Sequence, residues 1–383
     1  MSVSQAWRST ILSFPSLWSR IYVGSEFPPK VIRTLLQRSG SHPLDLTVPV
    51  RPESASRLSR RSNALEASKH MSRIRKLSIY EDSGENDVKH LLKIFSKPAP
   101  NLTHLLLVVY DDYFPISVPN WFGSDLPNLR KLEVGRVKAW PEAIGTNLTH
   151  IIIKCSLDPP QLIRCLQYSP SLKVLEILGV RGPLGTSEPQ RITLPSGIHL
   201  AIKNSPVCPD IVGLFSLPSD SSLQIETSFL RGWAPAMTFL LWTLPPELDH
   251  LQNLHTITRL RMKALLGIPT TRAAIEVKCF RGDLAVLDAK IEFPKKIEVQ
   301  SPIVGNVSPA MVLLNDLDGI VLRKVEELRM EGFFGYLEPY EVELLRLLTR
   351  MPVLVRVVTD NNQEKLRSAL NLLGRRATVV KVD

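Results

Sequence analysis

The sequence predicts an α/β fold in which short repeats stack into a solenoid, with parallel strands on the concave side and helices on the convex side. The main observation is a recurring phrase, Leu-x-x-Leu-x-Leu or its aliphatic equivalents, which begins at Ile74, Leu102, Leu129, Leu148 and Leu172. Consecutive copies are 19–28 residues apart. A second observation is that proline-punctuated segments with helical spacing of apolar residues lie between the copies. Each unit then supplies one strand and one helix.

This period is typical of leucine-rich repeats, which run about 20–29 residues. A single unit cannot bury its apolar strand alone, whereas stacked units share one core and leave one long face open. Further copies begin at Val325 and Leu354, and weaker ones near Ile198, Leu223 and Ile257. An ordinary doubly wound α/β domain also needs parallel strands and remains the alternative.

The segments between the strands support this assignment. Asp87–Phe95, Pro159–Tyr168 and Pro339–Arg350 each place apolar residues at helical spacing, and proline at a helix start or beyond its end is expected punctuation. Glu364–Leu373 is predicted to be a closing helix, with a final strand at Thr378–Val382. Strands are also predicted around Ile275–Val277 and Ile291–Phe293, where intervening helices are weak.

Composition indicates a soluble globular protein inside the cell. The 383 residues are 44% hydrophobic and 22% charged, which is ordinary for such proteins. The first residues lack a secretory pattern, and no stretch approaches the ~20 apolar residues of a membrane span. The four cysteines form no Cys-x-x-Cys pair. We therefore expect a cytoplasmic or nuclear protein with reduced thiols.

The sequence contains no recognisable enzyme motif. There is no phosphate-binding loop, dinucleotide-binding fingerprint, His-Glu-x-x-His motif or nucleophile elbow, so we expect no catalysis, no cofactor and no metal. The formal charge of +10 raises the alternative of nucleic-acid binding. The densest basic cluster, between Arg51 and Lys76, has little of the aromatic interleaving that stacks bases, which makes nucleic acid an unlikely partner.

The N-terminal segment carries a separate motif. A short amphipathic helix with Val3, Trp7 and Ile11 is followed by the turn Pro15-Ser-Leu-Trp18. A second segment contains a helix ending in Arg38-Ser-Gly and then the strand Pro43-Leu-Asp-Leu. Together these segments resemble fungal F-box-like proteins with leucine-rich repeats. The match is at the level of motif over about residues 3–46 and at the level of layout over most of the chain.

The resemblance implies a partner at this end of the chain. In that family the F-box docks onto the Skp-type adaptor of a cullin RING ubiquitin ligase, and the repeats select the substrate. The residues that match the second half of the F-box are Trp7, Arg8, Pro15, Leu17 and Trp18. The first F-box helix, with its Leu-Pro opening, is missing from this sequence. Because much of the adaptor contact comes from that helix, the alternative is that these side chains only cap the open end of the solenoid.

These observations divide the chain into three predicted segments. Residues 1–24 form the partial F-box-like segment, residues 25–70 a helix–strand linker or cap, and residues 71–383 the leucine-rich-repeat-like domain. The repeats are expected to be irregular around residues 181–310, where the phrase weakens.

The open face of the repeats is the predicted partner-binding surface. Side chains alternate along a strand, so the fourth and sixth places of each phrase face the core and the odd places face outward. Tyrosine and arginine are enriched at binding interfaces. The predicted partner-binding residues are Lys76, Tyr80, His104, Tyr110, Lys131, His150, Lys154, Arg259, Arg261 and Arg329.

The function that the sequence favours is therefore non-catalytic recognition of a protein. By resemblance, the chain is a receptor that selects substrates for an SCF-type ubiquitin ligase, with an unknown protein as the substrate. One alternative is a leucine-rich-repeat scaffold without a ligase link. A second is a basic nucleic-acid-associated protein.

Overall fold

The computed structural model describes most of the chain in two compact units, Met1–Leu175 and Glu176–Asp383. The described residues are 4–50, 57–81, 87–109, 116–117, 122, 126–135, 137–139, 147–154, 159–180, 191–205, 208–228, 249–266, 272–294, 322–331, 348–359, 363–374 and 377–381. The fold is mixed α/β, with extensive parallel β-sheet. Each unit is considered by itself.

The first unit is built on parallel strands that follow one another in sequence order. They are β1 (Arg20–Tyr22), β2 (Leu44–Val50), β3 (Ile74–Glu81), β4 (His104–Val109), β6 (Lys131–Gly135) and β8 (His150–Lys154). Each pairs in parallel with the next along this order. The short strands β5 (Ile116–Ser117) and β7 (Val137–Ala139) form a separate parallel pair. The division between the units falls within β9 (Val174–Leu178).

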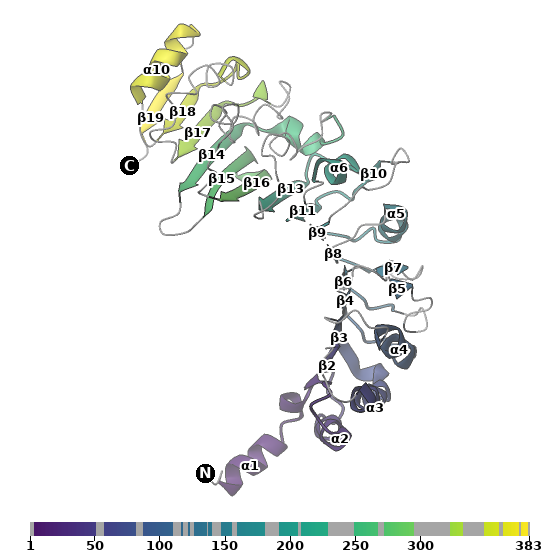
Figure 1. Ribbon diagram of the computed structural model, residues 1–383. Coiled ribbons are helices and arrows are strands. Elements are labelled where there is room, and N and C mark those ends of the chain that lie inside the picture. The colour runs from purple at the N-terminus through teal and green to yellow at the C-terminus, as the bar shows by residue number, and fades with distance from the viewer. Residues whose placement is uncertain are drawn as a thin grey trace. The chain divides into compact units, whose positions relative to one another are not determined.

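The helices of this unit lie between the strands in sequence. They are α1 (Gln5–Leu12), α2 (Pro29–Arg38), α3 (Arg57–Ser68), α4 (Asp87–Ile94) and α5 (Pro159–Gln167), with short 3-10 helices η1 (Pro15–Trp18) and η2 (Met71–Arg73). The helices predicted from Asp87 and Pro159 are confirmed. Helices α2 to α5 lie along the same side of the strands (Figure 1), with α2 packed on α3 and α3 on α4.

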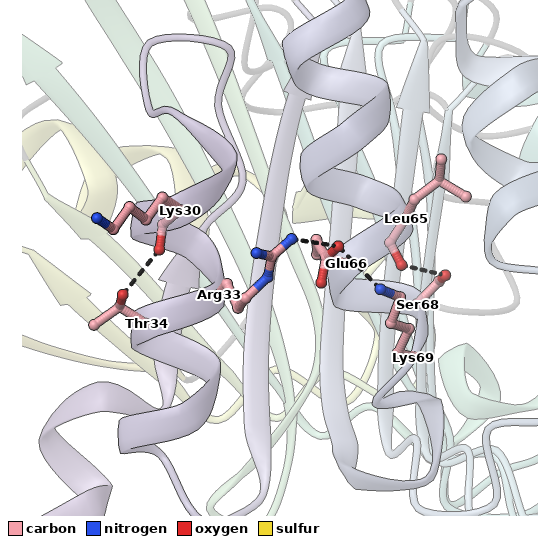
Figure 2. A network of polar contacts seen from close by, with 7 residues as sticks. All are labelled: Lys30, Arg33, Thr34, Leu65, Glu66, Ser68 and Lys69. Atoms are coloured by element: carbon pink, nitrogen blue, oxygen red, sulfur yellow. Dashed lines mark hydrogen bonds and ion pairs between the residues drawn. The ribbon is translucent and has the colours of Figure 1, made fainter.

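An ion-pair network links α2 to α3 (Figure 2). The Arg33 guanidinium lies 3.1 Å from Glu66 Oε1, and Lys69 Nζ lies 2.9 Å from the same oxygen. The hydrogen bonds from Arg33 and Lys69 hold the pKa of the Glu66 carboxyl below its ordinary value. Because the Arg33 side chain is 56% exposed, water screens the contact, and its stabilising effect is small.

The core of the first unit follows the alternation predicted from the phrase. Neighbouring strands bring Leu77, Leu105, Leu132 and Ile151 together in one row. Two residues further on, Ile79, Leu107, Val134 and Ile153 form a second row. Every member of both rows is at most 2% exposed. The period-two alternation of a strand therefore puts the phrase's fourth and sixth residues into a shared apolar layer.

In three of the repeats, an asparagine forms a hydrogen bond to the repeat before it. The residue preceding the first leucine of three phrases is asparagine, and each donates its Nδ2 to a backbone carbonyl in the preceding repeat. Asn101 bonds Ser72 O at 2.6 Å, Asn128 bonds Pro100 O at 2.7 Å, and Asn147 bonds Pro127 O at 2.6 Å. The same contact thus recurs at the same place in successive repeats, including across the short 19-residue step.

The second unit contains both parallel and antiparallel pairing. In spatial order its strands are β11 (His199–Lys203), β13 (Ser222–Ser228), β16 (Leu284–Pro294), β15 (Arg272–Arg281), β14 (Arg259–Leu266), β17 (Glu327–Glu331), β18 (Arg356–Thr359) and β19 (Thr378–Lys381). The short strands β10 (Ile192–Thr193) and β12 (Phe215–Ser216) pair separately. Its helical segments are α6 (Cys208–Gly213), η4 (Gln252–Thr256) and α10 (Gln363–Leu372).

One feature of this unit departs from a purely parallel sheet. Strands β14, β15 and β16 pair antiparallel, and β15 and β16 form a hairpin. The turn contains Gly282 at φ +56°, a left-handed conformation that glycine adopts without steric cost. This hairpin occupies part of the region predicted to be irregular, and it contains the strands expected around Ile275–Val277 and Ile291–Phe293.

The end of the chain matches the prediction. Helix α10 and strand β19 correspond to the closing helix and final strand expected from Glu364 onward. The helix predicted over 339–350 lies outside the described residues up to position 347. Among the helices that are described, none is both long and apolar enough to cross a lipid bilayer.

Candidate recognition surfaces

The N-terminal helix exposes the apolar side chains that the sequence placed on it. Ser4 caps α1, since its Oγ accepts a hydrogen bond from the backbone N–H of Trp7 at 3.2 Å. Trp7 is 66% exposed and Leu17, in η1, is 61% exposed. Ile11, Leu12 and Phe14 are exposed as well. We call these five side chains the N-terminal apolar patch.

Trp18 differs from these neighbours because other residues hold it in place. Its indole Nε1 donates to Ile11 O at 3.1 Å, and the Arg38 guanidinium carbon lies 4.8 Å from the ring centroid. Arg38 ends α2, so the two segments that carry the sequence motif contact one another here. The charge of Arg38 is attracted to the electron-rich ring face.

The predicted adaptor-binding residues are therefore divided between two roles. Trp7, Arg8 and Leu17 are exposed, while Pro15 and Trp18 are half-buried. The nearby buried core contains Ile21 and Val23, which are 2% and 0% exposed. Trp7 and Leu17 do not close the core here, and they remain accessible to a partner.

Four of the predicted partner-binding residues lie side by side on adjacent strands of the first unit. Lys76 on β3 pairs in register with His104 on β4, His104 with Lys131 on β6, and Lys131 with His150 on β8. Neighbouring strands are about 4.8 Å apart, so these side chains form a continuous row, which we call the basic row. All four are half-buried, as expected for the face opposite the leucines.

Each histidine of the basic row is oriented by the threonine before it. Thr103 Oγ1 lies 2.8 Å from His104 Nδ1 and donates to Arg75 O at 3.1 Å. Thr149 Oγ1 lies 2.9 Å from His150 Nδ1 and donates to Arg130 O at 3.1 Å.

These contacts assign the histidine tautomer. Each threonine hydroxyl has one hydrogen, and it donates that hydrogen to a backbone carbonyl. The hydroxyl oxygen must therefore accept from the imidazole, so Nδ1 of each histidine carries the hydrogen and donates it to the threonine. The other nitrogen, Nε2, then carries no hydrogen in the neutral ring.

The carboxylates beside the basic row are neutralised by other cations. Asp45 receives two hydrogen bonds from the Arg75 guanidinium, at 2.9 and 3.1 Å. Glu133 lies 2.5 Å from Lys154 Nζ. Among the residues that the structure describes, neither lysine of the basic row, Lys76 or Lys131, has a carboxylate within ion-pair distance. The row therefore keeps its positive charge.

The electrostatic effect is visible at His104. Partial burial, with Lys76 and Lys131 on the flanking strands, holds the pKa of its imidazole below the ordinary value. Both causes disfavour the charged form, burial because it removes water and the lysines because they repel a like charge. A negatively charged group placed near His104, Lys76 and Lys131 would therefore be electrostatically favourable.

The remaining predicted residues of this face lie in a different row. Tyr80, Val108, Gly135 and Lys154 follow one another in register. A Cβ on Gly135 would lie 3.0 Å from Val108 Cγ1 and 3.3 Å from Lys154 Cβ, so this row is closely packed. Val108 lies on β4 two residues beyond the outward-facing Leu106, yet it is only 1% exposed. Tyr110 lies outside the described residues.

In the second unit, two of the predicted residues, Arg259 and Arg329, contact their own chain. Arg259 lies 2.9 Å from Asp283 Oδ1, bonds Gly282 O, and stacks over Phe280 at 5.4 Å. Arg329 forms an ion pair with Glu331. Arg261 pairs in register with Arg329. Arg259 and Arg329 thus hold the local structure together, which lowers their availability to a partner.

Sequence reasoning missed the polar residues that organise these surfaces. The threonines that orient the histidines, and two of the three asparagines that link the repeats, belong to the phrase Asn-Leu-Thr-His, which occurs at 101–104 and 147–150. The recurrence of these four residues was the feature of the sequence that could have predicted both contacts. Arg38, which holds Trp18, had no such signal.

The described part of the chain contains no group of side chains that could bind a metal, and the two free thiols described in it are buried. No group of three His, Cys, Asp or Glu side chains there could hold a metal ion. Cys165 and Cys279 are buried free thiols. Burial raises the pKa of Cys165 to about 12, and it raises that of Cys279 as well. Such thiols behave as small hydrophobic side chains.

Comparison with known proteins does not extend this description. No family model matches the sequence, and no curated protein matches it either.

Proposed function

We propose that this chain is a non-catalytic protein-recognition module with a leucine-rich-repeat solenoid, and that it acts as an F-box-like substrate receptor for an SCF-type ubiquitin ligase. In this proposal the N-terminal apolar patch contacts a Skp-type adaptor, and the outward face of the strands contacts the substrate. The ligase supplies the chemistry. The site of action would be the cytoplasm or the nucleus.

The observation that carries the recognition role is the register of the repeats. The same position of successive phrases falls on hydrogen-bonded neighbours, so leucines meet leucines in the core and Lys76, His104, Lys131 and His150 meet outside. The asparagine contacts recur with the same period. A doubly wound domain would have helices on both faces of its sheet, whereas α2 to α5 lie on one side of these strands (Figure 1). These points support a solenoid with an open strand face.

The adaptor contact is supported by the exposure of the N-terminal apolar patch. Exposed apolar side chains that gather on one surface often mark a protein contact. A short helix of eight residues with no buried side chain among those described also gains little stability from its own chain. Docking on a partner would remove Trp7 and Leu17 from water.

The test is a titration of this chain with a purified Skp-type adaptor, followed by calorimetry. We expect the double substitution Trp7→Ala and Leu17→Ala to weaken binding by about tenfold or more, since buried aromatic anchors dominate many interfaces. The matched control is Leu58→Ala, which removes a side chain that is 80% exposed on α3 and should leave the affinity unchanged.

Failure of the unsubstituted chain to bind the adaptor would remove the ligase link. The alternative function, a scaffold that binds proteins through the same strand face, would then be favoured. A nucleic-acid role would instead require retention on a nucleic-acid column that falls steeply with salt.

A further inference from the structure

The basic row combines charge with apolar side chains in a repeating arrangement. Two residues beyond His104 on β4 is Leu106, and two residues beyond His150 on β8 is Ile152; both face the same side and are half-exposed. Between them, β6 carries Lys131 and then Glu133. The surface therefore presents a cationic line with aliphatic groups beside it.

We propose that the basic row, Lys76–His104–Lys131–His150, binds an acidic peptide segment that crosses the strands and places aliphatic side chains against Leu106 and Ile152. This inference rests on the proposed recognition function and names the class of partner for the same face. It does not depend on the adaptor contact.

Charge complementarity is the argument for an acidic occupant. The two carboxylates that border the row, Asp45 and Glu133, are already bound by Arg75 and Lys154. Asp45 is in register with Lys76 on β3, but among the described residues neither carboxylate forms an ion pair with a lysine of the row. Lys76 and Lys131 lie on the strands that flank His104 and repel a proton on its imidazole, and an external carboxylate lying between them would offset that repulsion.

The surrounding side chains favour a peptide over a nucleic acid. Glu133, two residues beyond Lys131 on β6, is paired with Lys154, so the cationic side chains form one short row that suits isolated carboxylates. Leu106 and Ile152 offer apolar contact rather than the aromatic faces on which bases stack. A peptide that alternates acidic and aliphatic side chains satisfies both features.

The histidines add a pH dependence to this binding. Charged and titratable groups around the two imidazoles come from every neighbouring element: Asp45 on β2, Arg75 and Lys76 on β3, Arg130 before β6, Lys131 and Glu133 on β6, Lys154 on β8, and Lys173 before β9. Most of them are positive, and Lys76, Lys131 and Arg75 disfavour a second proton on the His104 ring. A bound carboxylate opposes that effect, so binding takes up protons and strengthens as the pH falls.

The experiment measures the binding of a dye-labelled peptide of about ten alternating Glu and Leu residues, long enough to span the row at ~3.3 Å per residue. Fluorescence anisotropy is recorded at low salt, because salt screens exposed charges. The pH is set to 7.5 and to 5.5. The peptide carboxylates stay ionised in this range.

We expect binding at both pH values, with affinity roughly three- to tenfold higher at pH 5.5, as two surface ion pairs allow. Lys131→Gln should weaken binding about fivefold at either pH. The double substitution His104→Gln and His150→Gln should abolish the pH dependence. The matched control is His199→Gln, because His199 Nδ1 also lies 2.8 Å from a hydroxyl, that of Ser222, but outside the row.

Three comparison probes complete the test. A peptide of alternating Lys and Leu should not bind, and one of alternating Glu and Ser should bind more weakly. An oligonucleotide of equal charge that binds more tightly than the acidic peptide through the same residues would overturn the assignment of a peptide.

Other outcomes would also overturn the inference. These are no binding of the Glu–Leu peptide, or binding that Lys131→Gln and the double histidine substitution leave unchanged. If the chain still captures a defined protein partner in either case, the recognition function stands and only the acidic class is wrong. Circular dichroism of each variant confirms that the fold is retained.

Discussion

The strand faces of the two units carry different patterns of charge, although both patterns run across four adjacent, in-register strands. In the first unit, four adjacent strands carry Lys76, His104, Lys131 and His150 in register. In the second, four adjacent strands carry Lys203, Glu226, Lys290 and Glu276 in register. The second row alternates in sign, whereas the first contains no acid.

Along the row in the second unit, opposite charges on neighbouring strands stabilise the sheet. The basic row of the first unit has no such alternation, and our proposal assigns that role to a bound partner. Opposite charges directly across a strand pair each contribute roughly 0.2–1 kcal/mol, and like charges oppose pairing. The second unit adds a further pair next to this row, with Lys278 Nζ lying 2.9 Å from Asp288 Oδ2. In the first unit, neither Lys76 nor Lys131 forms an ion pair with a described carboxylate, and under our proposal a bound peptide supplies the opposite charge.

The largest expected effect comes from the apolar layer that lies beneath the exposed strand face within each unit. Leu107→Ala in the first unit and Ile225→Ala in the second should each lower the free energy of unfolding by about 2–5 kcal/mol, because both side chains are at most 1% exposed and would leave cavities. Urea unfolding measures the loss. The outward neighbours provide controls: Leu106→Ala and Gln224→Ala should each cost under about 1 kcal/mol. Equal losses at inward and outward positions would contradict the alternation.

A charge reversal at one position of each row should affect the stability of the two units differently. Glu276→Lys places a lysine opposite Lys290 and should lower the free energy of unfolding by about 1 kcal/mol. Lys131→Glu removes a like charge from the basic row and should change it by less than about 0.5 kcal/mol. Thermal unfolding of the two variants in low salt makes the comparison. If Lys131→Glu is the more destabilising of the two, the basic row is a structural feature of the fold.

The smallest expected effect is a pH dependence of stability in the first unit. The pKa of His104 is lower in the folded chain than its ordinary value, so the unfolded state binds more protons. Its contribution to stability is therefore present above about pH 6.5 and is lost as the pH falls. Because His104 is partly exposed, we expect a loss under about 1 kcal/mol between pH 7.5 and 5.5. His104→Gln should make this loss smaller, and Lys278→Gln should leave it unchanged.

The repeat phrase predicted most of the first unit because strand alternation and equal spacing leave few choices. Once Leu105 and Leu132 are assigned to the core, His104 and Lys131 must face outward, and the shared position in the phrase puts them next to each other. The helices from Asp87 and Pro159 were visible for the same reason, since apolar spacing and proline mark them.

Other features were not predictable because they depend on contacts between unrelated segments. Apolar alternation in residues 272–294 is the same for a parallel and an antiparallel strand, so the hairpin of β15 and β16 could not be read from it. The position of Arg259 in its strand places it on the predicted surface. Its guanidinium, however, donates a hydrogen bond to Asp283, 24 residues away in the sequence. The contact of Arg38 with Trp18 likewise follows from how α2 packs on η1.

The most direct test of the central claim, that the basic row is a recognition surface for acidic partners, is the affinity of one acidic peptide for two charge reversals. The alternating Glu–Leu peptide is titrated against Lys131→Glu and against Glu276→Lys at pH 6, with the unsubstituted chain as reference. We predict that Lys131→Glu weakens binding by about tenfold or more while Glu276→Lys leaves it within about twofold. Equal affinities for all three proteins would contradict the claim.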